Sequence, residues 1–138
     1  MNDLNSMVGK QASRSRRFGR PEVDTFGNLS GDLNPLHFET DAARQSRFKQ
    51  PIVHGMLTAS LISSVIGQDL PGPGTVYVSQ TLQFRAPVFI GETVTAKVEV
   101  IAVRPDKPLL TLKTTCTAGD GRVVLEGEAV VWFDPSHA

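Results

Sequence analysis

The pattern of hydrophobic and polar positions divides the chain into two unlike halves. In the first half, residues 56–67 are apolar around most of a helical circumference, which predicts a helix buried on nearly all sides. The pair His54-Gly55 precedes this helix, and the run Pro71-Gly72-Pro73-Gly74 ends it. The second half alternates apolar with polar residues and is rich in Val, Ile, Thr and Phe, which is typical of strands. The expected strands cover 75–88, 93–103, 109–118 and 123–133.

Short connections separate these expected strands, and such connections favour antiparallel neighbours. Upstream of the apolar helix, the pattern predicts a strand at 14–18 and a helix from Pro21 to about Leu29. One or two short helical turns are expected between Thr40 and Phe48. Together these elements predict an α+β fold in which a five-stranded antiparallel sheet curls around one long central helix.

Length and composition are those of a soluble globular protein. The 138 residues are 40% hydrophobic and 20% charged, so we expect a single domain over 1–138 with its core at about 8–133. The formal net charge is zero, which gives no reason to expect binding to nucleic acid or to a membrane. The stretch 56–67 is too short and too polar to span a bilayer, and residues 1–11 lack the apolar run of a secretory signal. A cytoplasmic protein is therefore expected.

The chain has one cysteine, Cys116, which excludes an intramolecular disulfide and a zinc site built from several cysteines. Its threonine-rich flanks indicate a strand, so we expect a small buried apolar side chain and not a reactive thiol. The sequence shows no glycine-rich phosphate loop, metal-ligand cluster or redox centre. It therefore predicts neither a metal nor a bound cofactor.

Candidate chemistry lies in two short segments. Asp32 and His37 are five residues apart, and Asn34-Pro35 lies between them. The residue before a proline avoids the helical region, so this segment predicts a bend that can return both side chains to one point. Gly55 begins the apolar helix, where unpaired N–H groups and the positive end of the helix dipole can hold a developing anion. Without a Cβ, Gly55 also lets a substrate carbonyl approach the backbone.

The same segments resemble a known family. Residues 30–37 (SGDLNPLH) and 48–57 (FKQPIVHGML) together resemble the hydratase-2 motif of the MaoC-like, hot-dog-fold (R)-specific enoyl-CoA hydratases. The similarity extends over roughly 8–133, through segments with the sequences LPGPGTVY, LQF, PVFIGE and GEAV. It is closest to the single-domain bacterial hydratases that feed polyhydroxyalkanoate synthesis.

This resemblance implies hydration of trans-2-enoyl-CoA, with short acyl groups, to (3R)-3-hydroxyacyl-CoA by syn addition. The product would supply polyhydroxyalkanoate synthesis or fatty-acid metabolism. Asp32 and His37 would hold one water, the Gly55 N–H would stabilise the thioester oxygen, and Asn34 would organise the loop. Ser63 would support the catalytic carboxylate, unless it bonds to a carbonyl of its own helix. The family is dimeric, so we expect a homodimer with active sites at the interface, and no cofactor beyond the CoA of the substrate.

Two other functions are compatible with this fold. A hot-dog acyl-CoA thioesterase usually carries its carboxylate on the central helix, and 56–67 contains no Asp or Glu. A non-catalytic subunit that binds acyl thioesters commonly lacks the Asp/His pair, whereas this chain has both residues. The motif therefore favours hydration over both alternatives.

Several further residues keep open interpretations. His54 is expected to cap or pack the helix, with catalysis as the less favoured alternative, and His137 is expected to be exposed. Three cations are interchangeable candidates for contact with the CoA phosphates: Arg85, Lys97 and Lys113. Three aromatic residues on expected strands are assigned to the core or to an interface: Phe84, Phe89 and Trp132.

Overall fold

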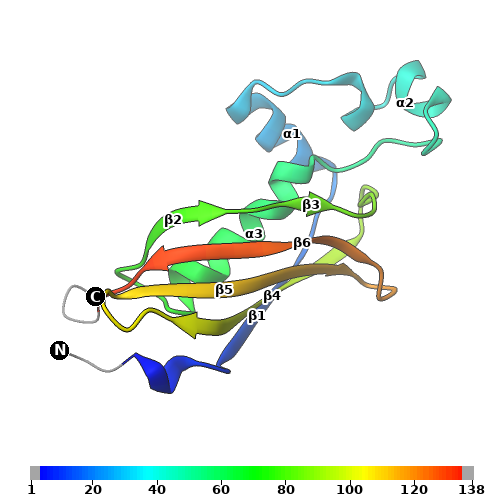
Figure 1. The fold of residues 1–138 in the computed structure, drawn as a ribbon. Helices are drawn as coiled ribbons and strands as arrows, with labels where there is room; N and C mark the ends of the chain where they lie inside the picture. The colour runs from blue at the N-terminus through cyan, green and yellow to red at the C-terminus, as the bar shows by residue number, and fades with distance from the viewer. Residues whose placement is uncertain (1–3, 135–138) are drawn as a thin grey trace.

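A six-stranded antiparallel sheet curls over one face of a long helix, α3 (Gly55–Gln68), in the computed structural model, which describes residues 4–134 (Figure 1). The strand order is β1-β4-β5-β6-β2, and β3 pairs with β6 next to β2. The strands are β1 (Gln11–Arg17), β2 (Val76–Gln80), β3 (Gln83–Phe84), β4 (Thr93–Val103), β5 (Leu109–Ala118) and β6 (Val123–Trp132). This architecture confirms the predicted α+β class. His137 lies outside the described residues.

The remaining helices precede α3 in the chain. They are η1 (Asn5–Met7), α1 (Arg20–Ser30), η2 (Pro35–His37) and α2 (Asp41–Gln45), where η marks a 3-10 helix. Helix α1 begins where the Glu22 carboxylate accepts a 2.7 Å hydrogen bond from the Gly19 N–H, and it ends at Gly31 in the left-handed conformation. Helices α1 and α2 lie near the end of α3 at which that helix begins (Figure 1). No helix within residues 4–134 is long and apolar enough to cross a membrane.

The hydrophobic core lies between the sheet and α3. Alternate residues of β4 and β5 point inward because side chains alternate across a strand. Helix α3 contributes Leu61, Ile62, Val65 and Ile66 to this core. Cys116 is fully buried on the inner face, as predicted, and burial raises the pKa of its thiol to about 12.

The opposite face of α3 is not covered, and this corrects the prediction of a helix buried on nearly all sides. Met56 is 56% exposed, and Ser60 and Ser63 are exposed on the same face. The sheet curls over only one side of the helix. The apolar residues around its circumference therefore led to an overestimate of how much of α3 is buried within one chain.

The expected strand at 75–88 is divided into β2 and β3, and this is a second correction. Both strands pair with β6, but the chain bends between them at Thr81. There the Thr81 N–H donates to the Glu128 carbonyl and the Glu128 N–H donates to the Thr81 hydroxyl, both at 2.9 Å. The bend brings the Thr81 carbonyl oxygen within 1.9 Å of the place that a Cβ on Gly127 would occupy. Only glycine fits under this bend.

We expect Gly127→Ala to lower the free energy of unfolding by at least about 2 kcal/mol, because the added methyl group meets backbone that cannot rotate away. Gly119→Ala is the matched control, since its Cβ would lie 3.9 Å from the Thr93 carbonyl oxygen and should change stability by less than about 0.5 kcal/mol. Chemical denaturation measures both variants. Equal stability of the two would contradict the proposed close approach.

Candidate active site

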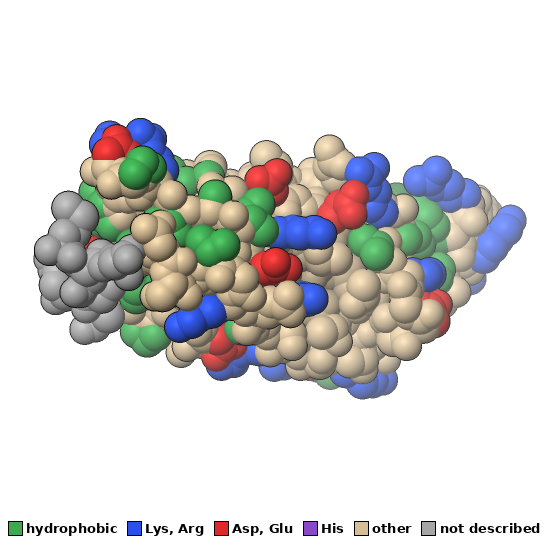
Figure 2. Space-filling model, turned by 60° about the horizontal axis from the view of Figure 1, so that its bottom comes forward, with side chains coloured by type: hydrophobic (Ala, Val, Ile, Leu, Met, Phe, Trp, Pro, Cys, Tyr) green, Lys and Arg blue, Asp and Glu red, His purple; other side chains and the backbone are tan. Residues whose placement is uncertain are grey.

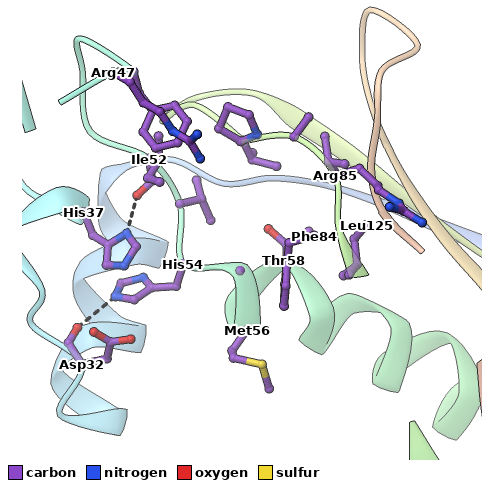
Figure 3. A pocket seen from close by; sticks show the side chains of 17 residues that line it. Asp32, His37, Arg47, Ile52, His54, Met56, Thr58, Phe84, Arg85 and Leu125 are labelled. Atoms are coloured by element: carbon purple, nitrogen blue, oxygen red, sulfur yellow. Dashed lines mark hydrogen bonds between the residues drawn. The ribbon is translucent and has the colours of Figure 1, made fainter. Parts of the chain in front are cut away.

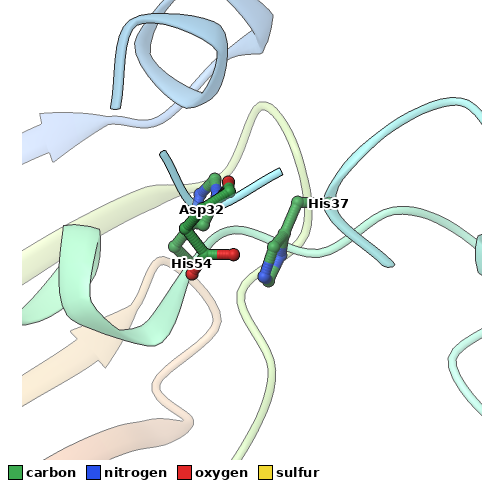
Figure 4. Close-up of side chains that lie close together, drawn as sticks. All are labelled: Asp32, His37 and His54. Carbon is green, nitrogen blue, oxygen red and sulfur yellow. Dashed lines mark hydrogen bonds between the residues drawn. The ribbon is translucent and has the colours of Figure 1, made fainter. Parts of the chain in front are cut away.

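Three segments meet where α3 begins: the loop that follows α1, the short helix η2, and the residue that precedes α3 (Figure 4). They contribute Asp32, His37 and His54, whose carboxylate and ring-nitrogen atoms lie within 4.8 Å of one another. The bend at Asn34-Pro35 therefore returns Asp32 and His37 to one point, as the sequence predicts. Their catalytic role stays a prediction at this stage.

Local hydrogen bonds shape the loop that carries Asp32. The Ser30 hydroxyl accepts from the Asp32 N–H at 3.1 Å, and the Asp32 carboxylate accepts from the Asn34 N–H at 3.3 Å. The Asn34 side-chain oxygen accepts from the Leu36 N–H at 3.1 Å and caps η2. Asn34 thus organises the loop through its side-chain amide, which agrees with the role expected for it.

His37 is 9% exposed, and a single hydrogen bond fixes its tautomer. Its Nδ1 lies 2.8 Å from the Ile52 carbonyl oxygen, which can only accept, so Nδ1 carries the hydrogen. In the neutral ring Nε2 is then an unprotonated acceptor on the side of Asp32 and His54 (Figure 3).

The surroundings of His37 favour its neutral form. Burial lowers the pKa of His37 below its usual value, and the nearby His54 and Arg20 act in the same direction. The hydrogen bond to Ile52 and the charge of Asp32 oppose this shift. The ring is therefore a base that is available at neutral pH.

His54 is 1% exposed and stacks on His37, with ring centroids 3.9 Å apart and ring planes 31° apart. Its Nε2 lies 2.9 Å from the main-chain carbonyl oxygen of Asp32, so Nε2 carries the hydrogen. Its Nδ1 has no hydrogen-bond partner among residues 4–134. His54 is the N-cap residue of α3 by position, but its side chain makes no capping bond. The packing interpretation is therefore correct, and the capping interpretation is wrong.

A pocket of about 420 Å³ opens beside these residues (Figure 3). Asp32 and His37 line one end, and Gly55 lies next to them as the first residue of α3, where its N–H has no acceptor within the helix. Phe84 packs directly on Gly55, because a Cβ there would lie 2.6 Å from its ring. Phe84 is also 53% exposed and lines the pocket, so of its two expected assignments the core is wrong and the interface stays a prediction.

Sequence reasoning missed two residues that line the pocket. Thr58 is buried, and its hydroxyl has no hydrogen-bond partner in the described part of the chain. Its position three residues after Gly55, on the same side of the helix, was the available signal. Arg47 is exposed, and its guanidinium lies 4.8 Å above the ring of Phe48. Nothing in the sequence distinguishes Arg47 from other surface arginines.

The structure separates the three candidate cations for CoA. Arg85 lines the pocket and forms a 2.9 Å ion pair with Glu126. Lys97 and Lys113 lie on the solvent face of β4 and β5, away from the site. Figure 2 shows acidic and basic side chains interspersed over one face of the molecule, without a large patch of one sign.

Ser63 does not lie with Asp32. It is exposed, it is not among the residues that line the pocket, and no hydrogen bond between described residues joins it to Asp32. Its neighbours Ser60 and Ser64 do bond to carbonyls of their own helix. The expectation of a buried serine that needs a partner is therefore wrong within one chain, because Ser63 faces away from the sheet.

Asp32, His37 and His54 bring together three side chains of the types that bind metal ions. The imidazole rings of His37 and His54 stack with centroids 3.9 Å apart and planes 31° apart. One nitrogen of each ring is also bonded to a carbonyl oxygen. The other nitrogen of each ring is left as an acceptor, and the expected absence of a metal stays a prediction.

A sheet curled around one helix is the hot-dog fold, and the acid–base pair at the start of that helix gives this hot-dog protein a candidate enzyme site. The family described as the MaoC like domain matches residues 7–118. The chain therefore belongs to the MaoC-like family.

Named relatives support this assignment. An (R)-specific enoyl-CoA hydratase of Aeromonas caviae is 52% identical over 124 residues, which cover 90% of this chain and 92% of the relative. A 3-hydroxybutyryl-CoA dehydratase of Methylorubrum extorquens is 46% identical over 90% of this chain and 78% of its own length. The solved structure of an (R)-hydratase from A. caviae involved in polyhydroxyalkanoate biosynthesis has a TM-score of 0.89 at 50% identity. That match covers 92% of this chain and 96% of the solved chain.

We expect His37 to titrate with a pKa below about 6.5, the value of an unperturbed histidine, because burial disfavours the charged ring. Heteronuclear NMR of histidine-labelled protein over a pH series measures this pKa, and His37→Gln assigns the signal. As pH falls, the neutral base should persist below the range in which an exposed histidine is already protonated. A pKa above about 7 would contradict the argument from burial.

Proposed function

We propose that this protein hydrates short-chain trans-2-enoyl-CoA to (3R)-3-hydroxyacyl-CoA in the cytoplasm, for polyhydroxyalkanoate synthesis or fatty-acid metabolism. The observation that carries the proposal is the arrangement around one pocket. The unprotonated Nε2 of His37 and the carboxylate of Asp32 line the same pocket as Gly55, whose N–H at the start of α3 has no acceptor within the helix. Hydration of an enoyl thioester needs an acid–base unit next to an anion site.

The chemistry follows from these positions. A water held by Asp32 and His37 gives a proton to this pair as its oxygen bonds to C3 of the substrate. Negative charge moves to the thioester oxygen, where the Gly55 N–H and the positive end of the α3 dipole stabilise it. The proton then returns from the pair to C2, so water is added in full and no other reactant is needed. We treat Asp32 and His37 as one unit, because they lie together and the charge of Asp32 acts on the protonation of His37.

The position of the acid–base pair also supports the stereochemistry. Both groups lie at the same end of the pocket, so oxygen and proton reach the double bond from one face. Addition from one face is syn addition, and the (3R) configuration that we propose for the product is the one in the name of the (R)-specific relative. The reverse reaction is the dehydration of a 3-hydroxyacyl-CoA, which agrees with the name of the dehydratase relative.

Two arginines in the pocket lining support a CoA substrate. Arg47 lines the pocket and forms no ion pair with another residue of 4–134, so its charge is available to a phosphate. Arg85 shares its charge with Glu126, so we expect it to contribute less. Apolar groups of Val53, Val88 and Val124 line the same pocket and suit an acyl chain. We expect no cofactor beyond the CoA of the substrate.

Purified protein with crotonyl-CoA tests the function. We expect loss of the enoyl absorbance and formation of (3R)-3-hydroxybutyryl-CoA, identified by chiral analysis of the product. Asp32→Asn and His37→Gln should each lower kcat by at least about 1,000-fold while the melting temperature is kept. The double variant should be little worse than either single variant, because both groups serve the same water.

Three outcomes would contradict this proposal. An (S) product would place the water on the other face of the substrate. Release of free CoA without hydration would identify a thioesterase. Retention of about a tenth of the wild-type kcat in either single variant would remove that residue from the acid–base unit.

We further propose that the active form is a homodimer. Strand β2 is an edge strand, and Val76, Tyr77 and Val78 next to its unpaired backbone groups are exposed. Asp32 and Met56 are also exposed at the rim of the pocket. A second copy that covered the β2 edge and the open face of α3 would shield both and enclose the substrate.

Light scattering at assay concentrations should give the mass of two chains. Val78 is 57% exposed on the β2 edge, and we expect Val78→Lys to give monomers with lower activity. Val123→Lys is the control, because Val123 is exposed at the start of β6, away from that edge. A single-chain mass for the wild-type protein with full activity would show that one chain is sufficient.

A further inference from the structure

The ring of His54 lies between the two halves of the proposed acid–base unit. It donates to the Asp32 main chain at 2.9 Å through Nε2, and its face stacks on the His37 ring at 3.9 Å. Phe26 and Phe38 close the other sides, with ring centroids 4.9 Å and 6.2 Å from the His54 ring. The imidazole is therefore enclosed by three aromatic rings and one carbonyl group.

An imidazole is an unfavourable choice for such a position unless its hydrogen bond is needed. Nδ1 of His54 is buried without a partner among residues 4–134, and an unpaired buried polar atom costs free energy. A phenylalanine would fill similar space among aromatic neighbours without that cost. What it would not supply is the Nε2–H that the Asp32 carbonyl accepts.

This hydrogen bond connects two parts of the site that otherwise belong to different elements. The other hydrogen bonds of Asp32 join it to Ser30 and Asn34, within its own loop. His54 is covalently joined to Gly55, whose N–H is the proposed donor to the thioester oxygen. One residue therefore sets the distance between the carboxylate and the oxyanion donor.

We propose that His54 is a positioning residue that fixes the Asp32 loop through its Nε2–H and supports the neutral His37 ring by stacking. This inference rests on the proposed hydratase function, because it assigns His54 a role in that chemistry. His54 is 1% exposed and also belongs to the lining of the pocket, and the proposed role rests on these two contacts. Its two roles are separable, since one needs a donor and the other needs a ring.

Two substitutions separate the roles. His54→Gln keeps an amide donor that can reach the Asp32 carbonyl but removes the ring over His37. His54→Phe keeps the ring and removes the donor. The readouts are kcat and KM for crotonyl-CoA, the acid limb of the pH profile of kcat/KM, and the melting temperature.

We expect His54→Phe to lower kcat at least about 10-fold, because the Asp32 loop loses its anchor, while KM changes by less than about threefold. Its acid limb should move to higher pH by less than that of His54→Gln, because a ring still covers His37 and only the charge effect of His54 is lost. We expect His54→Gln to keep kcat within about threefold of wild type. Its acid limb should move to higher pH, because water then reaches the imidazole. The charged or titratable groups that face His37 are Asp32, Arg20 and His54, and only His54 changes in these variants.

Two kinetic outcomes would overturn the inference. If His54→Phe kept the wild-type kcat, the bond to Asp32 would position nothing. If both variants lost kcat equally and neither moved the acid limb, neither the Nε2–H donor nor the ring of His54 would have the separate role proposed here. Melting temperatures close to that of the wild type make either result interpretable.

NMR of the wild-type protein provides a test that needs no variant to fold. The nitrogen shifts of His54 should show the Nε2–H tautomer, and finding the hydrogen on Nδ1 would overturn the inference.

NMR also separates this inference from the proposed function. If the wild-type protein did not hydrate crotonyl-CoA, the function would fail. The pKa of His37 would still decide the stacking role, because it should rise more in His54→Gln than in His54→Phe.

Discussion

The packing of the curled sheet against one side of α3 fixes the first residue of that helix, and the site is built outward from this point. The inner faces of β4 and β5 bury the helix along Leu61, Ile62 and Val65, so the start of α3 cannot shift without disturbing the core. Helices α1 and η2 then bring the acid–base pair to this fixed helix end, and Arg20 helps to hold them together by donating to the His37 carbonyl at 2.7 Å. The precision of the site thus derives from a hydrophobic interface that contains none of the reactive groups.

Where local chemistry decides a structure, the sequence was sufficient to predict it. The bounds of β4 and β5 match the expected strands residue for residue, because their alternation is strict and both turns are unambiguous. The division at Thr81 could not be predicted, because it depends on a close approach to Gly127, which is distant in the sequence. The burial of α3 was overstated for a similar reason. Composition reports that a helix face is apolar, but not whether the same chain covers it.

At the site, the same distinction holds between bonds made within a segment and contacts made across the fold. The convergence of Asp32 and His37 follows from the proline between them, and the family resemblance selects this pair from many others. The bond from His54 to Asp32 spans 22 residues, and no local pattern indicates it. Ser63 is exposed on the open face of α3, so no contact within the described chain joins it to Asp32, and its support of the carboxylate stays a prediction.

The burial of Cys116 has a practical consequence for distinguishing the chemistries that this fold supports. Thioester cleavage liberates a thiol, whereas hydration consumes the double bond and leaves the thioester intact. The only thiol of the protein lies in the core with its pKa raised to about 12, so it is almost entirely protonated and shielded from reagents in solution. A disulfide reagent added to the folded protein and substrate therefore reports released CoA against a background close to zero, and the reaction that this pocket catalyses can be identified without labelling the substrate.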